Sequence, residues 1–315
     1  MPAAANLRGA LLGLAAMGSY ATHDAIIKIL GGRYSPFQTM FFVALISLPV
    51  LVLVAAGRSG NGLRPRNPGW EAARTICMTG GMLGGMIAFA ALPLTQVYAI
   101  LFSMPLLITV LSIPMLGERV GTQRWAAVLI GLIGVLIVLR PGQAALSAGH
   151  LGALVSALGG ALAAVIARRL GGREDTLVLV VWPMMLNLGV CALALPLIYR
   201  PMPGADLGLA ALIALFGLIG ASLSVLSYRT GEAAVVAPMQ YSQILWAVLY
   251  GWLLFAEMPD RATLLGLVII IGSGLYILWR ETRQVQSQRP VLESECAGEA
   301  LPSPSLGGFR RLLRF

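Results

Sequence analysis

The chain has 315 residues, of which 58% are hydrophobic and 11% are charged, and its formal net charge is +9. Soluble domains carry about 25% charged residues, so the composition excludes an ordinary soluble protein and predicts an all-α polytopic membrane protein. The Lys and Arg residues lie between apolar segments and form no single patch. They are better explained as signals of membrane topology than as a nucleic-acid-binding surface.

Ten apolar segments approach or reach the length of about 20 residues that crosses a bilayer. In chain order they cover residues 7–30, 37–56, 72–92, 96–116, 123–139, 151–170, 177–199, 207–228, 233–255 and 262–279. Links that contain Pro or Gly, such as "GGRYSP" and "RPMPG", separate most of them. We therefore predict ten transmembrane helices, followed by a tail at 281–315 whose Pro, Ser and Glu content is typical of disorder.

The distribution of positive charge predicts the orientation of these helices. If the N-terminus is inside, 17 of the 22 Lys and Arg residues fall on the inner side and five on the outer side. Cytoplasmic segments carry the excess of Lys and Arg in membrane proteins. We therefore expect a multi-pass protein of the cell inner membrane with both termini, and the tail, in the cytoplasm.

The two halves of the chain repeat each other. "GGR" follows the first span at 31–33 and the sixth span at 171–173, while "MLGE" ending at Glu118 corresponds to "LFAE" ending at Glu257. Five spans in each half place the second half upside down relative to the first. The sequence thus predicts two inverted five-helix repeats, at 1–140 and 141–280, an architecture that recurs in transporters. Glu118 and Glu257 would lie at opposite faces, either as helix-end anchors or as gates.

The span ends "LGE" and "FAE", each followed by a short polar link and a Gly-rich span, resemble the drug/metabolite transporter superfamily of the EamA type. The resemblance implies a helical bundle, a central cavity lined by spans 1, 3, 4, 6, 8 and 9, and no cofactor. Asp24 and Lys28, four residues apart, are similar to a subgroup that includes uptake carriers for S-adenosylmethionine and riboflavin. Many members of that subgroup carry an Arg in the second span, where this chain has Val43.

Asp24 is the most unusual residue of the first span, because a carboxylate in hydrocarbon is costly unless it is paired or hydrated. Lys28 lies one helical turn away, so a helix-end ion pair between the two is one interpretation. In the other interpretation Asp24 faces the cavity and binds a cationic group or a proton. His23 would then be a second candidate for proton coupling.

Further candidate substrate-binding residues lie in three spans. Pro105 and Pro238 should bend the fourth and ninth spans and free carbonyl groups there. The candidates are Tyr20 and Asp24 in the first span, Tyr98 and Ser103 in the fourth, and Gln240, Tyr241, Gln243 and Trp246 in the ninth. Amides beside an aromatic ring suit an amino-acid-like, nucleoside or heteroaromatic substrate, and interhelical hydrogen bonding is the alternative. Asn187 is left out, because the resemblance places the seventh span at the periphery.

These features favour a secondary transporter that works by alternating access. A non-transporting accessory or structural membrane subunit is the alternative. We expect no enzyme and no catalytic or metal site, because the two histidines lie in different halves and no Asp/Glu cluster or nucleotide motif is present. The expected partners are a small-molecule substrate and membrane lipid, with no nucleic acid, and a homodimer is left open.

Overall fold

The structure, a computed structural model, describes residues 3–56, 64–118, 120–140, 147–170 and 176–277. The regular secondary structure of this part of the chain is helical throughout, with no strand. Five helical segments in it are long and apolar enough, by length and composition alone, to cross a membrane. The protein is an all-α polytopic membrane protein, as predicted. The tail at 281–315 lies outside the described residues.

Each predicted span corresponds to helical structure. Among the described residues, eight spans are uninterrupted: α1 (Ala3–Gly31), α2 (Pro36–Ala56), α3 (Pro68–Ala91), α6 (Thr122–Leu139), α7 (Ala148–Leu170), α8 (Thr176–Ile198), α9 (Gly204–Thr230) and the last helix (Arg261–Ile277). The fourth span is divided into α4 (Leu94–Leu101) and α5 (Met104–Leu116). The ninth is divided into α10 (Ala233–Val236), the 3₁₀ helix η1 (Ala237–Ser242) and α11 (Gln243–Phe255).

The two divided spans confirm the effect predicted for their prolines. Pro105 stands at the beginning of α5, directly after the break at Phe102 and Ser103. Pro238 stands at the beginning of the 3₁₀ segment η1. Proline has no backbone N–H to donate to the preceding turn, so the α-helical hydrogen bonding is interrupted at both points.

The internal repeat is visible in the helix boundaries. α5 and α11 both have 13 residues, and each begins and ends 139 residues from its counterpart. Each is followed by a residue in the left-handed conformation, Gly117 with φ of 72° and Ala256 with φ of 52°. α3 and α9 also end 139 residues apart, at Ala91 and Thr230. The repeat therefore extends to the way individual helices end.

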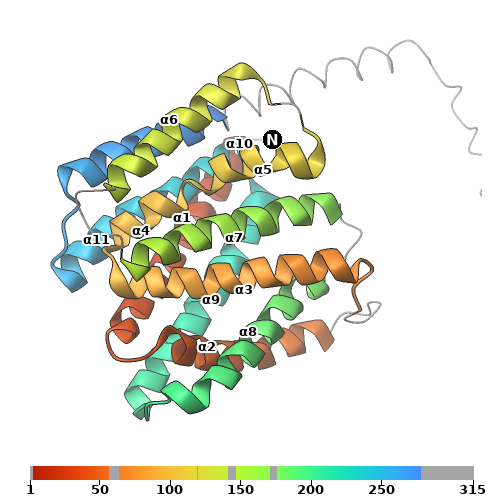
Figure 1. Cartoon of the computed structure of the whole chain (residues 1–315), viewed down its shortest axis with the longest axis vertical. Coiled ribbons are helices and arrows are strands. Elements are labelled where there is room, and N and C mark those ends of the chain that lie inside the picture. The colour runs from red at the N-terminus through yellow and green to blue at the C-terminus, as the bar shows by residue number, and fades with distance from the viewer. Residues whose placement is uncertain (1–2, 57–63, 119, 141–146, 171–175, 278–315) are drawn as a thin grey trace, which may run out of the picture. The chain divides into compact units, whose positions relative to one another are not determined.

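Helices of one repeat pack against helices of the other. α1 packs along α9, and the equivalent pair, α7 and α3, also packs together. Figure 1 shows α3 and α7 side by side. α2 and α8, which are equivalent to each other, also pack together. Glycines allow the close approach of α3 and α7. A Cβ built on Gly84 would lie 2.5 Å from the carbonyl oxygen of Gly152, which is the small-residue packing common between membrane helices.

The two ends of the bundle differ. We call the end where α1, α3 and α11 finish the Lys28 end, and the end where α5, α7 and α9 finish the Arg168 end. α1 packs against α3, and α4 against α11. Over the described residues, the equivalent pairs, α7 with α9 and α5 with the α10–η1 segment, make no extensive contact. The structure thus closes the Lys28 end more completely than the Arg168 end.

Candidate functional site

A cavity of about 420 Å³ lies between α1, α2, α3, α8 and α9. We call it the main cavity. Its wall is mostly apolar and includes four methionines, and its polar residues are Tyr20, His23, Ser47, Arg74 and Asn187. Pockets for small organic ligands have volumes of about 300–1,000 Å³ and combine an apolar wall with a few polar groups. The main cavity fits this description.

Two glycines of α9 make room for the aromatic residues that α1 contributes to the main cavity. A Cβ on Gly217 would lie 3.3 Å from Cδ2 of His23, and a Cβ on Gly220 would lie 3.0 Å from the Tyr20 ring. Larger residues at these positions would push the rings away from α9. The sequence of α9 therefore determines how His23 and Tyr20 lie in the cavity.

Asp24 accepts hydrogen bonds from two neighbouring side chains. The Tyr98 hydroxyl donates to Oδ2 at 2.5 Å, and Nδ1 of His23 is 2.7 Å from Oδ1. Gln243 of α11 lies close to Tyr98. We call His23, Asp24, Tyr98 and Gln243 the Asp24 cluster. Within it, His23 is the residue that also lines the main cavity, so a hydrogen-bonded path leads from the cavity to the buried Asp24.

Lys28 pairs with Glu257 of the second repeat and not with Asp24. Its Nζ lies 2.7 Å and 2.9 Å from the two carboxylate oxygens of Glu257 and donates to the carbonyl oxygen of Leu92 at 2.7 Å. These contacts, which we call the Lys28 tie, join the ends of α1, α3 and α11. The carboxylate of Asp24 is hydrogen-bonded to Tyr98 and His23. The ion pair between Asp24 and Lys28, one of the two interpretations of the sequence, is therefore not formed.

The repeat places residues equivalent to the three members of the Lys28 tie at the Arg168 end. The offsets of 139 and 140 residues relate Lys28 to Arg168, Glu257 to Glu118, and Leu92 to Gly231. Arg168 and Glu118 are both exposed. Neither side chain makes a hydrogen bond or ion pair with any part of the protein that the structure describes. The tie is therefore formed at one end and open at the other.

The other predicted site residues do not line the main cavity. The Trp246 ring packs against Gly18 of α1, and its Nε1 is buried without a partner among the described residues. Tyr241 stacks edge-on against Phe102 at 5.1 Å between ring centres, and Ser103 donates to the carbonyl of Ile100. Gln240 is exposed. Of the eight predicted substrate-binding residues, the structure places Tyr20 at the cavity, and Asp24, Tyr98 and Gln243 in the cluster behind His23.

Sequence reasoning misses three polar residues of the main cavity. It counts Arg74 with the topology signals, assigns Asn187 to a peripheral span and does not single out Ser47. The main cavity is lined by the helices of spans 1, 2, 3, 7 and 8, not by the set that the resemblance implied. Neither Ser47 nor Asn187 is ionisable, and Ser47 donates to the Val43 carbonyl of its own helix, so the sequence carried no strong signal for either.

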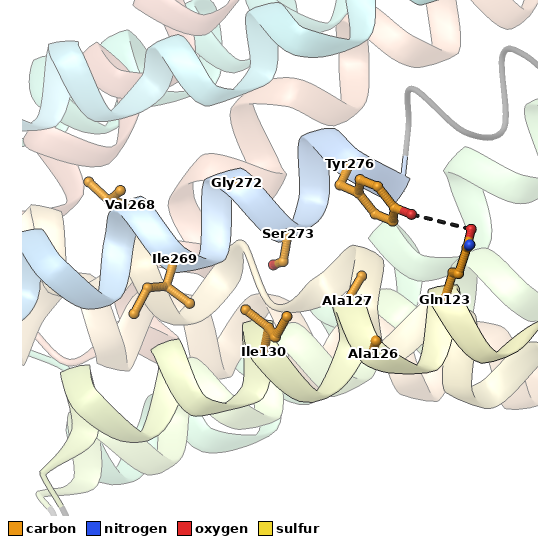
Figure 2. Close-up of a pocket in the computed structure, with 9 residues that line it drawn as sticks. All are labelled: Gln123, Ala126, Ala127, Ile130, Val268, Ile269, Gly272, Ser273 and Tyr276. Atoms are coloured by element: carbon orange, nitrogen blue, oxygen red, sulfur yellow. Dashed lines mark hydrogen bonds between the residues drawn. The ribbon is translucent and has the colours of Figure 1, made fainter.

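A second hollow, between α6 and the last helix, has a different character. The two helices cross at Gly134 and Gly266, where a Cβ on Gly266 would lie 2.6 Å from the carbonyl oxygen of Gly134. The same two helices line a groove of about 470 Å³ (Figure 2). Its polar residues are Gln123, Ser273 and Tyr276, and none of the described residues that line it is charged. The groove is separate from the main cavity and offers fewer groups for orienting a substrate.

Comparison with known proteins agrees with this architecture. The sequence profile of the EamA-like transporter family matches residues 7–140 and 147–279. One solved crystal structure covers 88% of this chain and 98% of its own, with a TM-score of 0.60 at 19% identity, which supports the fold alone.

Several relatives are named transporters. An S-adenosylmethionine uptake transporter from Rickettsia bellii is 24% identical over 275 residues, covering 87% of this chain and 94% of the relative. A riboflavin transporter from Rhizobium johnstonii is 30% identical over 244 residues, covering 77% and 80%. The pseudopaline exporter CntI from Pseudomonas aeruginosa is 24% identical over 269 residues, covering 84% and 93%. With both halves of the chain matched to the same profile, this multi-pass membrane protein belongs to the EamA-like transporter family.

Proposed function

We propose that the protein is a secondary transporter that moves a small organic metabolite across the inner membrane by alternating access. The proposal rests on one observation: the Lys28 tie is formed, and the equivalent contact at the Arg168 end is not. Lys28, Glu257 and the Leu92 carbonyl are joined, whereas Arg168 and Glu118 are exposed and apart from any partner among the described residues. An inverted repeat that closes one end and leaves the equivalent end open is what alternating access requires.

The positive charge of the chain supports a cytoplasmic location for the Arg168 end and for both termini. In that orientation the structure is the inward-facing state, and the Lys28 tie closes the external side. Transport then consists of breaking the Lys28 tie while forming its counterpart, in which Arg168 would bond to Glu118 and to the carbonyl at the end of α9. Ion pairs of similar strength at the two ends would keep the two states close in free energy.

The Asp24 cluster is the proposed route for a coupling proton. Asp24 lies behind His23, which lines the main cavity and bonds to it. A histidine beside a cavity can exchange a proton with water and pass it to a carboxylate. Protonation of Asp24 would weaken the hydrogen bond that it accepts from Tyr98 of α4. Proton binding would thereby be linked to the contact between α1 and α4.

The experiment is a thiol-accessibility assay on membrane vesicles. Ser47, which lines the main cavity, is changed to Cys in a background without the three native cysteines. A membrane-impermeant thiol reagent is then applied from either side. Gly121→Cys and Ala205→Cys, at exposed positions near opposite ends of the bundle, report which side the reagent reaches.

The proposal predicts that the thiol introduced by Ser47→Cys reacts from the cytoplasmic side in this cysteine-free background. Adding Glu257→Gln should raise its reaction rate from the external side and lower it from the cytoplasmic side, because the Lys28 tie is weakened. Equal reaction from both sides, or a Glu257→Gln protein with unchanged rates on both sides, would contradict alternating access.

A further inference from the structure

A polar pocket lies at the Lys28 end of the bundle, apart from the main cavity. It has a volume of about 500 Å³ and is lined by residues 31–35, which link α1 to α2, and by residues 197–200 at the end of α8 and just after it. Arg33 and Arg200 both line this pocket, and we call it the arginine pocket. It shares no lining residue with the main cavity. It is therefore a separate site that the proposed function does not use.

A buried glutamine fixes the backbone of Arg200. Gln38 of α2 is completely buried. Its Nε2 donates to the Arg200 carbonyl oxygen at 2.6 Å, and its Oε1 accepts from the Arg200 backbone N–H at 2.9 Å. A buried amide that is bonded through both its oxygen and its nitrogen holds its partner in one position. The peptide groups on either side of the Arg200 side chain are therefore attached to α2.

A buried carboxylate fixes the other side of the arginine pocket. Oδ1 of Asp206 in α9 accepts from Nη1 of Arg33 at 2.9 Å, and Oδ2 accepts from the Tyr34 hydroxyl at 2.6 Å. Nη1 of Arg200 donates to the Arg33 carbonyl oxygen at 3.3 Å. These bonds connect α9, the link after α1 and the residues after α8, so both arginines are anchored to the bundle.

The arginine pocket carries more positive than negative charge. The carboxylate of Asp206 is bonded to Arg33 and Tyr34, and Arg200 makes no ion pair with the residues that the structure describes. None of the described residues that line the pocket is acidic. Both arginines are exposed, so their guanidinium groups can reach a ligand. Two cations in one pocket favour an anion.

Membrane topology does not explain these two arginines. With the N-terminus inside, Arg33 and Arg200 belong to the five basic residues on the outer side, against 17 on the inner side. An excess of Lys and Arg marks the cytoplasmic side of a membrane protein, so two outer arginines in one pocket act against that signal. A ligand of opposite charge accounts for them.

The apolar side of the arginine pocket belongs to the lipid-facing surface. Leu193 and Leu197, one turn apart on α8, are 82% and 88% exposed, the two highest values among the large apolar residues that the structure describes. α8 is long and apolar enough to cross a membrane, so exposed leucines near its end lie against acyl chains. Tyr199 follows them and is exposed, as is typical of an aromatic residue at the membrane interface. The arginines thus stand where headgroups meet hydrocarbon.

We propose that the arginine pocket binds the phosphate group of an anionic phospholipid. Arg33 and Arg200 bond to the phosphate oxygens in charge-assisted pairs, and the acyl chains lie along Leu193 and Leu197. A lipid whose headgroup also carries an ammonium group fits less well, because none of the described lining residues is acidic and could pair with it. The bound lipid joins the link after α1 to the link after α8. The proposal does not depend on transport.

The test measures lipid binding to the purified full-length protein by native mass spectrometry. The lipid probes are dioleoylphosphatidylglycerol and dioleoylphosphatidylcholine, which have the same acyl chains and differ in the net charge of the headgroup. Glycerol phosphate and inorganic phosphate, added as competitors, supply the phosphate group without acyl chains. The proteins are wild type, Arg33→Gln, Arg200→Gln and the control Arg261→Gln, which changes an exposed arginine at the same end that does not line the pocket.

We expect wild type to bind one phosphatidylglycerol about tenfold more tightly than phosphatidylcholine, as charge-assisted bonds to a phosphate imply. Arg200→Gln should remove most of this preference, and Arg261→Gln should keep it. Arg33→Gln should also lower the preference, but it takes an ion-pair partner from the buried Asp206. Arg200 gives up one side-chain bond, to a carbonyl oxygen, so Arg200→Gln decides if Arg33→Gln does not fold. Neither soluble phosphate should displace the lipid at equal concentration.

Equal affinity of wild type for the two lipids would overturn the proposal, and so would a preference that Arg200→Gln retains in full. Displacement of phosphatidylglycerol by an equal concentration of glycerol phosphate or inorganic phosphate would show that the pocket takes a soluble anion and not a lipid. A preference that Arg261→Gln loses as well would show that it depends on the total charge of this end. These results do not involve uptake, so failure of this proposal and failure of the proposed transport are distinguishable.

Discussion

The ammonium group of Lys28 in the first repeat lies 2.7 Å and 2.9 Å from the two carboxylate oxygens of Glu257 in the second. The side chain of Lys28 is 10% exposed and that of Glu257 is 29% exposed, so the pair is partly removed from water. Such a pair matters most when one partner is lost, because the other charge is then left without its counterpart. The contact thus links the two repeats at one end of the bundle.

Exchanging the two charges should separate the effect of the pair from that of either residue. Lys28→Glu and Glu257→Lys should each reduce initial uptake about tenfold or more, because each places two like charges together. The double variant should recover a substantial part of the uptake. Uptake into liposomes at matched protein amount is the measurement. If the double variant is no better than the worse single variant, the ion pair is not what the two residues contribute.

The equivalent residues at the other end should matter for transport and not for folding. Arg168→Gln and Glu118→Gln should leave the unfolding temperature within error of wild type, since both side chains are exposed and make no hydrogen bond or ion pair with the described residues in this state. Uptake should nevertheless fall, because the outward-facing state loses its tie. Arg229→Gln, an exposed basic residue near the same end, is the control and should transport normally. Full activity of Glu118→Gln would exclude the proposed exchange of ties.

Asp24 should be required for transport, and its hydrogen-bond partner Tyr98 should contribute to it. Asp24→Asn should abolish uptake while leaving the amount of protein in the membrane unchanged, because the amide can still bond to Tyr98 but cannot carry a proton. Tyr98→Phe removes one buried hydrogen bond, worth about 1 kcal/mol, and should lower uptake less severely. Immunoblots of membranes and uptake assays measure the two quantities. A loss of Asp24→Asn protein from the membrane would indicate a structural role instead.

The contact between α3 and α7 provides a test of stability with a control in the same helix. Gly84→Ala should destabilise the protein by about 1–3 kcal/mol, because the new Cβ would lie 2.5 Å from the Gly152 carbonyl oxygen and the helices would have to separate. Gly80→Ala is the control, since its Cβ meets nothing within 4 Å. Thermal unfolding in detergent measures both, and equal unfolding temperatures would show that the approach is looser than described.

The spans could be predicted from the sequence because each is a local property. An apolar stretch of sufficient length becomes a helix in a bilayer because its backbone groups must bond within the segment. Over the described residues, each of the ten predicted segments is helical, and two of them contain a break. The breaks near Pro105 and Pro238 agree with the loss of a backbone donor at proline. Proline alone does not determine where a helix breaks, however, because α2 contains Pro49 and α8 contains Pro183 without interruption. The duplication was visible because the offset recurs in motifs as short as those ending at Glu118 and Glu257.

The contacts of the site could not be predicted in the same way. Lys28 has Asp24 one turn away in sequence, but its partner, Glu257, lies 229 residues farther along. The sequence of α4 alone does not show that Tyr98 faces Asp24, because the orientation of α4 depends on how the helices pack across the bundle. In the sequence, Arg74 cannot be told apart from the arginines that signal topology. Only its place on the wall of the main cavity identifies it as a candidate for binding.

The most direct test of alternating access is a pair of distance measurements in one protein preparation. Spin labels at Gly32 and Ala91 report the Lys28 end, and labels at Ala167 and Tyr228 report the Arg168 end, each pair in its own cysteine variant. Under conditions that drive transport, the first distance should lengthen as the second shortens, in matching fractions of molecules. If both distances lengthen together, or neither changes while uptake continues, the exchange of ties between the two ends is wrong.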